Sequence, residues 1–390
     1  MSVRTIRLTA RGWALVWTSF ASLALGTLLE RREGLFVAVF LMIVVVLCAV
    51  SVASQKAKVR VVRRVPEDGQ CGESLEIVCE IHATGSLAAV SGWTDSIPST
   101  FGPAPTGVLP PRRMMRGGRA AVRYKVVPSV RGRYDIGPFR ITLSDALGVC
   151  DMSRSVGEST GILVLPLVSV LAAGDLIPPA GEGNQHDRTR PTAPRADELI
   201  ARDYRPGDPL RRVHWRATAR HGQLMVRQEE PQADPETLIL LDVAAGHVRA
   251  DALVDLAASI AVHLSNEGFR VTFAESDTTW VDAPPRDPHA ILTALAVWPG
   301  GTLGAARDIA LRSERRFSDR IPIFVLTSDV DRLGDLVAIA ANAVPAVAFV
   351  ASGSGLSRAA VPAPWVAAGL ADRVDVAASW DRLQRRLVHG

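Results

Sequence analysis

Two long apolar runs near the start of the chain are separated by a short polar turn. The runs cover residues 12–29 and 35–53, and the turn between them covers residues 30–34. At a rise of ~1.5 Å per residue, each run is just long enough to cross the hydrocarbon core of a bilayer as a helix. Because the turn is so short, the pattern predicts a transmembrane helical hairpin over residues 1–57, with both ends on the same side of the membrane.

Basic residues flank the hairpin and indicate its orientation. They are concentrated outside the turn: Arg4, Arg7, Arg11, Lys56, Lys58, Arg60, Arg63 and Arg64 against Arg31 and Arg32. Because cytoplasmic flanks carry the excess of basic residues, we expect a cell-membrane protein with two spans and both termini in the cytoplasm. The alternative is a cleaved signal peptide over the first run, which a second and more apolar run directly after it disfavours.

Residues 58–171 show a different pattern, in which short apolar segments are broken by turn residues. Within residues 75–82, Leu75, Ile77, Cys79 and Ile81 alternate with more polar neighbours. Similar segments cover residues 59–65, 120–128, 139–145 and 161–166. This alternation is typical of antiparallel strands with one packed and one solvated face, so the region is predicted to be a β-sandwich-like domain.

Residues 172–198 have no apolar period and are rich in glycine, proline and polar residues, which predicts a flexible loop or linker.

From residue 233 to 390, apolar strand segments alternate with amphipathic helix segments. Strands are expected at 237–243, 269–274, 321–327 and 344–350, and helices at 251–266, 288–297, 305–315, 331–341 and 379–388. Such an order predicts an α/β domain with an open, mostly parallel sheet of the Rossmann type.

The lysine and cysteine content argues against several classes of function. Three of the 44 basic residues are lysines and none stands in a GxxxxGK[ST] loop, so an NTPase with its own phosphate loop is not expected. The four cysteines form no CxxC pair, which argues against a zinc ribbon. A Cys71–Cys79 disulfide and free thiols are both conceivable, and a reducing cytoplasm favours free thiols. No nucleic-acid module is recognisable, and basic residues near the membrane fit lipid headgroups better.

Residues 199–232 hold the densest polar pattern of the chain. They contain YxxGDxxRxxHWxxxAR, formed by Tyr204, Gly207, Asp208, Arg211, His214, Trp215, Ala219 and Arg220. This segment, called the signature segment below, resembles that of the membrane-anchored bacterial family known as domain of unknown function fifty-eight. The resemblance implies a MoxR-type AAA+ ATPase as a partner, together with other membrane proteins.

The chemistry of the signature segment allows two roles. Prolines around Gly207 and Asp208 indicate a turn, and arginines at 212, 216 and 220 would form a basic stripe on one helix face. The segment is then either a docking surface or a staple between the two domains; its polar members are Tyr204, Arg205, Asp208, Arg211, His214, Trp215, Arg216 and Arg220. His214 as a general base is a further alternative, but a histidine beside Trp215 is more often a packed residue.

The α/β region also resembles the von Willebrand A-type domain, which implies a divalent-cation site at the strand ends. Asp242, Thr302 and Asp329 occupy the matching places, and oxygen ligands of this kind suit Mg²⁺. Where that site has a DxSxS motif, this chain has Ala244 and Gly246, so two hydroxyl ligands are missing. Weak binding of Mg²⁺ or another divalent cation, completed by water, and a fold that has lost its metal are the two alternatives.

These patterns together favour a scaffold or interaction protein that works with the ATPase on the assembly or maturation of envelope or other complexes. The alternative function is a metal-dependent hydrolase that uses Asp242, Thr302 and Asp329. No GxSxG or HExxH motif is present to indicate another catalytic class.

A reporter fused to the C-terminus tests the predicted orientation. Alkaline phosphatase fused after Gly390 is expected to be inactive, because the enzyme needs the periplasm to fold and the basic flanks keep the C-terminus inside. Phosphatase activity of that fusion in intact cells would contradict a cytoplasmic body.

Overall fold

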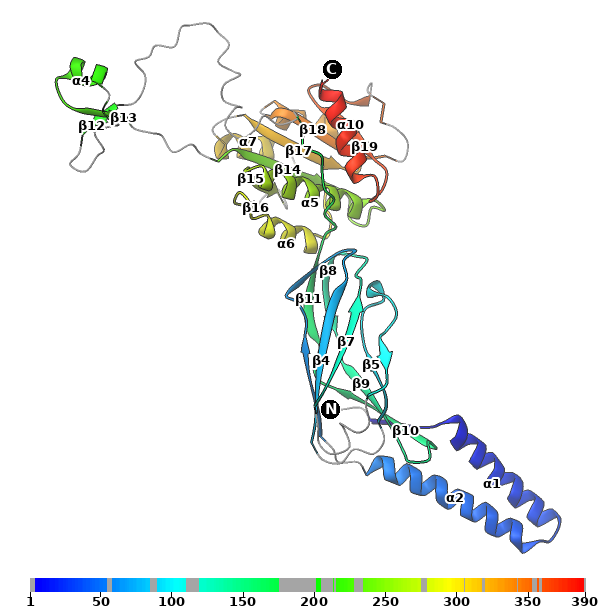
Figure 1. Cartoon of the computed structure of the whole chain (residues 1–390). Helices are drawn as coiled ribbons and strands as arrows, with labels where there is room; N and C mark the ends of the chain where they lie inside the picture. The colour runs from blue at the N-terminus through cyan, green and yellow to red at the C-terminus, as the bar shows by residue number, and fades with distance from the viewer. Residues whose placement is uncertain are drawn as a thin grey trace. The chain divides into compact units, whose positions relative to one another are not determined.

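The structure, a computed structural model, describes residues 4–54, 58–84, 90–109, 119–174, 201–204, 213, 215–227, 234–274, 279–304, 306–317, 320–341, 343–352, 356–357 and 360–388. It divides into two compact units, which are described separately (Figure 1). The first comprises Met1–Leu167 with Leu292–Trp298, and the second Val168–Ile291 with Pro299–Gly390. The β-rich region was predicted to end at residue 171, which is close to Leu167, where the first stretch of the first unit ends.

The two apolar runs form a pair of antiparallel helices, α1 (Ala10–Leu28) and α2 (Arg32–Ala53). Small residues let their backbones approach closely. A Cβ atom on Gly26 would lie 2.9 Å from the Cα of Gly34. Ser19 donates a hydrogen bond to the carbonyl of Ala38 (2.8 Å), and Ser22 donates one to Gly34 (3.1 Å). Small and hydroxyl-bearing residues at a helix contact are typical of helices that pair within a membrane.

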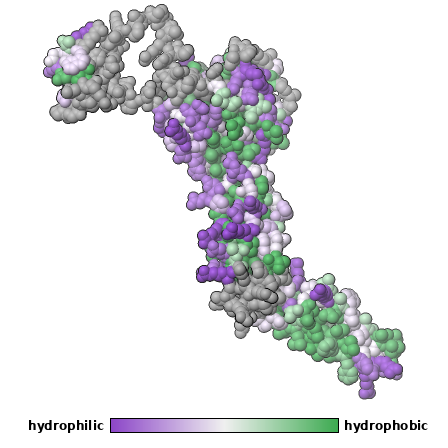
Figure 2. All heavy atoms as spheres, viewed as in Figure 1, coloured by the Kyte–Doolittle hydropathy of each residue, from purple (hydrophilic) through white to green (hydrophobic). Residues whose placement is uncertain are grey.

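Of the helices in the described residues, α2 is long and apolar enough to cross a membrane, with a mean hydropathy of 3.2 over its most apolar window. Helix α1 falls short of that hydropathy because it contains Arg11 and several hydroxyl and glycine residues. Figure 2 shows hydrophobic side chains gathered over the helix pair. One candidate membrane-spanning helix is therefore present near the N-terminus.

The β-rich region folds into three small sheets around one core. One sheet has the order β1-β10-β9-β5-β6, the second β2-β4-β7 and the third β3-β11-β8. The strands are β1 (Arg4–Leu8), β2 (Lys58–Arg64), β3 (Asp68–Gln70), β4 (Leu75–Thr84), β5 (Val90–Asp95), β6 (Thr106–Gly107), β7 (Arg119–Val126), β8 (Gly132–Ile136), β9 (Phe139–Ser144), β10 (Cys150–Val156) and β11 (Thr160–Leu165). A short 3₁₀ helix, η1 (Ser99–Phe101), follows β5. Strands β2, β4, β7, β9 and β11 confirm the predicted segments, whereas β1, β3, β5, β6, β8 and β10 were not expected.

Strand β1 ties the start of the chain to the β-rich unit. It pairs antiparallel with β10, from Arg4 opposite Arg154 to Leu8 opposite Cys150. The next residue, Thr9, donates to the carbonyl of Gly148 (2.7 Å) and caps α1 by accepting from the amide of Gly12 (3.2 Å). From the sequence, these residues were expected only to form a basic flank. A five-residue strand directly before a long apolar helix is too short to show a clear alternation of apolar and polar residues.

A buried carboxylate joins two of the sheets. Asp95, at the end of β5, is fully buried and accepts two hydrogen bonds from Arg63 of β2, at 2.7 and 3.2 Å. Tyr124 of β7 donates to it at 2.6 Å and Cys79 of β4 at 3.6 Å. Burial, with the adjacent Asp95, raises the pKa of the Cys79 thiol to about 12. All four cysteines are free and buried, as the compartment argument favoured.

The second unit contains a six-stranded sheet with the order β16-β15-β14-β17-β18-β19. Neighbouring strands are parallel except at the edge, where β16 runs antiparallel to β15. The strands are β14 (Glu236–Asp242), β15 (Arg270–Ala274), β16 (Trp280–Ala283), β17 (Ile321–Thr327), β18 (Ala343–Ala351) and β19 (Val366–Leu370). Four match predicted strands, and the short edge strands β16 and β19 were missed.

Helices cover both faces of this sheet. On one face, Trp380 of α10 (Val376–Val388) stacks on Phe324 and Phe349, beside α5 (Ala250–Asn266). On the other, buried residues of α7 (Ala306–Arg316), α8 (Arg332–Asp335) and α9 (Val337–Ala340) share a core with Leu238 and Ile323. The helix predicted at 331–341 is thus two short helices. Helix α6 (His289–Val297) agrees with the segment predicted at 288–297.

Removing the charge of Asp95 tests whether the buried pair holds the sheets together. Asp95→Asn leaves the Arg63 guanidinium buried without its counter-ion, which is expected to destabilise the unit by about 3–5 kcal/mol. Hydrogen exchange of the full chain in detergent micelles should show faster exchange in β4 and β5. Glu80→Gln is the control, because Glu80 pairs with the exposed Arg64 and is expected to contribute at most about 1 kcal/mol. Wild-type exchange in Asp95→Asn would contradict the role of the pair.

Candidate functional site

The candidate site lies where β14 and β17 end. These strands are neighbours in the sheet, yet the chain leaves β14 toward β15 on one side and reaches β17 on the other. In open α/β sheets, ligands bind outside the carboxyl ends of the strands at such a reversal of strand order. Asp242 is the last residue of β14, and Thr327, the last of β17, lies opposite it in the register. Both residues are buried.

Hydrogen-bond donors surround the carboxylate of Asp242. Its Oδ1 accepts from the amide of Leu303 (2.6 Å) and from Nη2 of Arg332 (3.2 Å), and its Oδ2 accepts from Nε of Arg332 (2.9 Å) and from Thr327 (3.4 Å). Arg332 also donates to the carbonyl of Leu303 (2.7 Å) and to Asp335 (3.0 Å). The hydrogen bond to Asp242 raises the pKa of Arg332 above its usual value. The result is a closed ion pair whose carboxylate has no exposed surface.

The two further residues predicted as metal ligands lie in the loops next to this carboxylate, and both are exposed. Asp329 follows β17 and is exposed, and its Oδ1 accepts a hydrogen bond from the amide of Asp331 (3.1 Å). Thr302 is exposed in the loop before α7, one residue ahead of the amide that binds Asp242. Within the described residues, no group of three or more His, Cys, Asp or Glu side chains is arranged to hold a metal ion.

The loop after β14 is held close to the glycine pair at 300–301. Val243 and Gly301 exchange backbone hydrogen bonds of 3.0 and 2.8 Å. Gly300 has a φ of 90°, and a Cβ atom there would lie 3.0 Å from the Cα of Ala245. The positive φ and the missing side chain of Gly300 therefore allow the two loops to approach each other. Ala244 and Gly246, at the positions where a DxSxS motif would have hydroxyls, are exposed in this loop.

The signature segment forms a small element of its own in the second unit. Strands β12 (Ala201–Asp203) and β13 (Met225–Arg227) pair antiparallel, and α4 (Trp215–His221) lies between them in sequence. The amide of Tyr204 donates to Leu224 (2.8 Å), and the amide of Met225 donates to Thr218 (3.0 Å). Trp215 exposes 70% of its surface at the start of α4.

Several predicted docking residues fall outside what the structure describes. These are Arg205, Gly207, Asp208, Arg211 and His214, together with the side chain of Arg216. Arg220 is exposed near the end of α4, one helical turn after position 216. Arg212, the first member of the predicted basic stripe, is also outside the described residues, so the full stripe stays a prediction.

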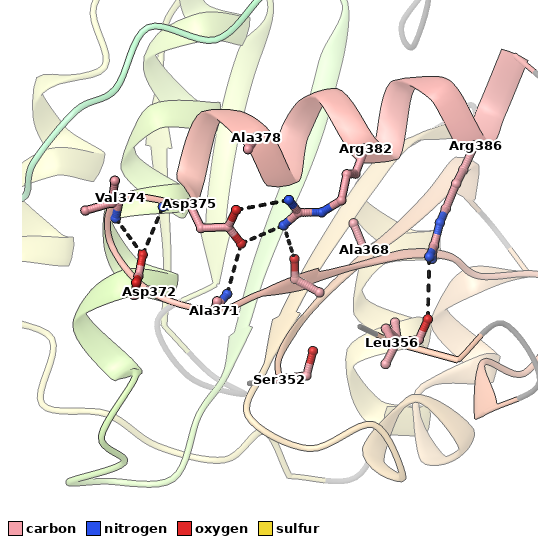
Figure 3. A pocket seen from close by; sticks show the side chains of 11 residues that line it. Ser352, Leu356, Ala368, Ala371, Asp372, Val374, Asp375, Ala378, Arg382 and Arg386 are labelled. Atoms are coloured by element: carbon pink, nitrogen blue, oxygen red, sulfur yellow. Dashed lines mark hydrogen bonds and ion pairs between the residues drawn. The ribbon is translucent and has the colours of Figure 1, made fainter. Parts of the chain in front are cut away.

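A separate cavity of about 560 Å³ lies at the carboxyl ends of β18 and β19, beside α10 (Figure 3). Two of its charged groups, Asp375 and Arg382, already bind each other. Arg382 holds both oxygens of Asp375, at 3.0 and 2.6 Å, and also donates to the carbonyl of Gly369 (2.8 Å). The hydrogen bond from Arg382 lowers the pKa of Asp375. None of the residues predicted to form a site lines this cavity, and its ion pair closes the turn between β19 and α10.

Arg332 is the site residue that the sequence did not indicate. It is 90 positions from Asp242, in the segment expected to be an ordinary amphipathic helix. Arginine is very common in this chain, so its residue type gave no signal. Only the pairing of β14 with β17 brings the start of α8 to the carboxylate.

Residues 200–331 match the family model described as "Protein of unknown function DUF58". The matched stretch includes the signature segment and the α/β unit from β14 to the loop after β17. This match supports the DUF58 family. It covers about a third of the chain, and Arg332 lies one residue beyond it. No curated protein matches the chain.

Two solved structures show distant likenesses. The CARDB domain of the PF1109 protein from Pyrococcus furiosus, in complex with di-metal ions, is 13% identical over 28% of this chain and 89% of that chain, with a TM-score of 0.21. A beta-glucosidase from Listeria innocua is 10% identical over 28% of this chain and 16% of that chain, with a TM-score of 0.19. At these TM-scores the likenesses carry no argument about function.

The Asp375–Arg382 pair predicts a pH dependence for the second unit. Because the pKa of Asp375 is lowered in the fold, the pair stabilises the unit above the unfolded value of about 4, and the contribution is lost as the pH falls through the folded value. Asp375→Asn should lower stability to thermal unfolding at pH 7, with the gap to wild type narrowing below about pH 4. Asp381→Asn, on the same helix, is the control. A gap that does not change with pH would contradict the ionic role.

Proposed function

We propose that this chain is a membrane-anchored scaffold with a cytoplasmic body, which binds a MoxR-type AAA+ ATPase and other membrane proteins during assembly or maturation of envelope or other complexes. The observation that carries the proposal is the exposure of Trp215, of which 70% is open to solvent. It lies in the segment that matches the family model, on the same short helix as the exposed Arg220 and His221. A large exposed aromatic ring with a charged rim is typical of an anchor for a protein partner.

The helix pair supports anchoring by two spans. Helix α2 has the length and hydropathy of a span, and the hydroxyl groups of α1 bind carbonyls of α2. Strand β1 directly before α1 and strand β2 shortly after α2 both belong to the β-rich unit. A chain whose two helix ends return to the same folded unit needs both ends on one side of the membrane. The basic flanks favour the cytoplasmic side, where they would also meet anionic lipid headgroups.

The second unit is proposed to be a von Willebrand A-like domain that acts as an interaction module. Its strand order and its helices on both faces support an open doubly wound sheet. A metal-dependent hydrolase at Asp242, Thr302 and Asp329 stays a prediction that the geometry does not favour. Such an enzyme needs an open carboxylate, whereas both oxygens of Asp242 bind groups of the chain itself.

A pull-down of the tagged full-length protein from its own membrane tests the scaffold. The wild type is expected to recover a MoxR-type ATPase, identified by mass spectrometry. Trp215→Ala should reduce that recovery about tenfold or more, since truncating an aromatic anchor costs about 2 kcal/mol or more of binding free energy.

Leu311→Ala is the matched control, because Leu311 is an exposed hydrophobic residue on α7, outside the signature segment. It should recover as much ATPase as the wild type. Failure of the wild type to recover the ATPase would overturn the proposed partner. Equal recovery by Trp215→Ala would overturn the docking role of the signature segment.

A further inference from the structure

The resemblance to the von Willebrand A type implies a divalent cation at Asp242, and the residues present do not fit one. A cation at this place needs a carboxylate oxygen that faces outward and hydroxyl oxygens beside it. The positions of the two hydroxyls hold Ala244 and Gly246. The carboxylate of Asp242 has no exposed surface.

Most of the acceptor capacity of Asp242 is already used. An ionised carboxylate offers about four acceptor positions. The amide of Leu303 and Nη2 of Arg332 bind Oδ1, and Nε of Arg332 binds Oδ2. The hydroxyl of Thr327 lies 3.4 Å from Oδ2 and 3.1 Å from the carbonyl oxygen of Asp329. Both oxygens of the carboxylate are therefore bound by the chain, and its lack of exposed surface leaves no open side for a metal ion.

The guanidinium of Arg332 supplies the positive charge that a cation would otherwise bring. It binds both oxygens of Asp242 side by side and also the carbonyl of Leu303 at 2.7 Å. It thereby links the end of β14 and the loop before α7 to the start of α8. A metal ion bridging carboxylate and carbonyl oxygens would make the same kind of connection. Unlike a metal ion, the arginine cannot dissociate.

We propose that Arg332 is a permanent internal cation that replaces the divalent ion at this strand-end site. The second unit then keeps its closed site without metal, at any physiological metal concentration. If the unit binds a partner, as the proposed function holds, the partner contacts this edge of the sheet directly and not through a bound metal ion. The proposal about Arg332 itself does not depend on which partner is bound.

The test measures thermal unfolding of the full-length protein in detergent micelles, with EDTA or with millimolar MnCl2 as the probe. The wild type and Arg270→Ala, which breaks an exposed ion pair with Asp234, are expected to unfold at temperatures that Mn²⁺ does not change. Arg332→Ala should unfold at a lower temperature in EDTA, because Asp242 loses its counter-ion. Mn²⁺ should restore several degrees, since a ligand that binds only the folded state raises its stability. Arg332→Ala combined with Asp242→Asn should not respond to Mn²⁺.

Two results would overturn the proposal. The first is a wild-type protein that Mn²⁺ stabilises and whose response Asp242→Asn abolishes. The second is a folded Arg332→Ala protein that Mn²⁺ does not stabilise. If Arg332→Ala does not fold, the response of the wild-type protein to Mn²⁺ still tests the proposal. Calorimetric titration of Arg332→Lys with Mn²⁺ is a second test. No heat of binding is expected, and binding would count against the proposal. These measurements are separate from ATPase recovery, so failure of the scaffold proposal would leave them unaffected.

Discussion

A carboxylate that is shielded from water must be surrounded by donors, because an unpaired buried charge costs several kcal/mol. Two such carboxylates organise the two units of this protein. Asp95 joins β5 to β2, β4 and β7 through Arg63, Cys79 and Tyr124. Asp242 joins the ends of β14 and β17 to the start of α8 through Arg332. In each unit a bidentate arginine provides both the opposite charge and the geometry that fixes neighbouring elements.

The elements with a strong apolar period could be predicted from the sequence. Strands β14 and β17 are continuous apolar runs, and α5 repeats apolar residues at helical spacing, so their expected and observed bounds differ by at most one residue. Strands β16 and β19 were missed because they are short and lie at the edges of the sheet, where a partner strand rather than an apolar run defines them. Strand β1 was missed for the same reason.

The candidate site was only half predictable. Asp242 stands out because a lone carboxylate ends an apolar strand, and that signal is local in the sequence. Arg332 is 90 positions away, and nothing in its own neighbourhood distinguishes it from the many other arginines of the chain. Its role arises from the sheet topology, which places β17 beside β14 and starts α8 at the switch point. The residues of a metal site can therefore be recognised from their spacing in the sequence. An arginine that takes the place of the metal ion can be recognised only from the fold.

The loss of the two hydroxyls and the presence of Arg332 are best understood together. Because Ala244 and Gly246 offer no hydroxyl ligands, a divalent ion would keep most of its water, and Asp242 would still need a close positive charge in its buried position. An arginine meets that need through directional hydrogen bonds, which replace metal coordination by contacts that the chain makes itself. The site then serves the architecture of the second unit, while recognition of a partner is proposed for the signature segment with its exposed Trp215. Separation of these two tasks explains how the strand-end carboxylate can be closed in a protein whose proposed role is to bind.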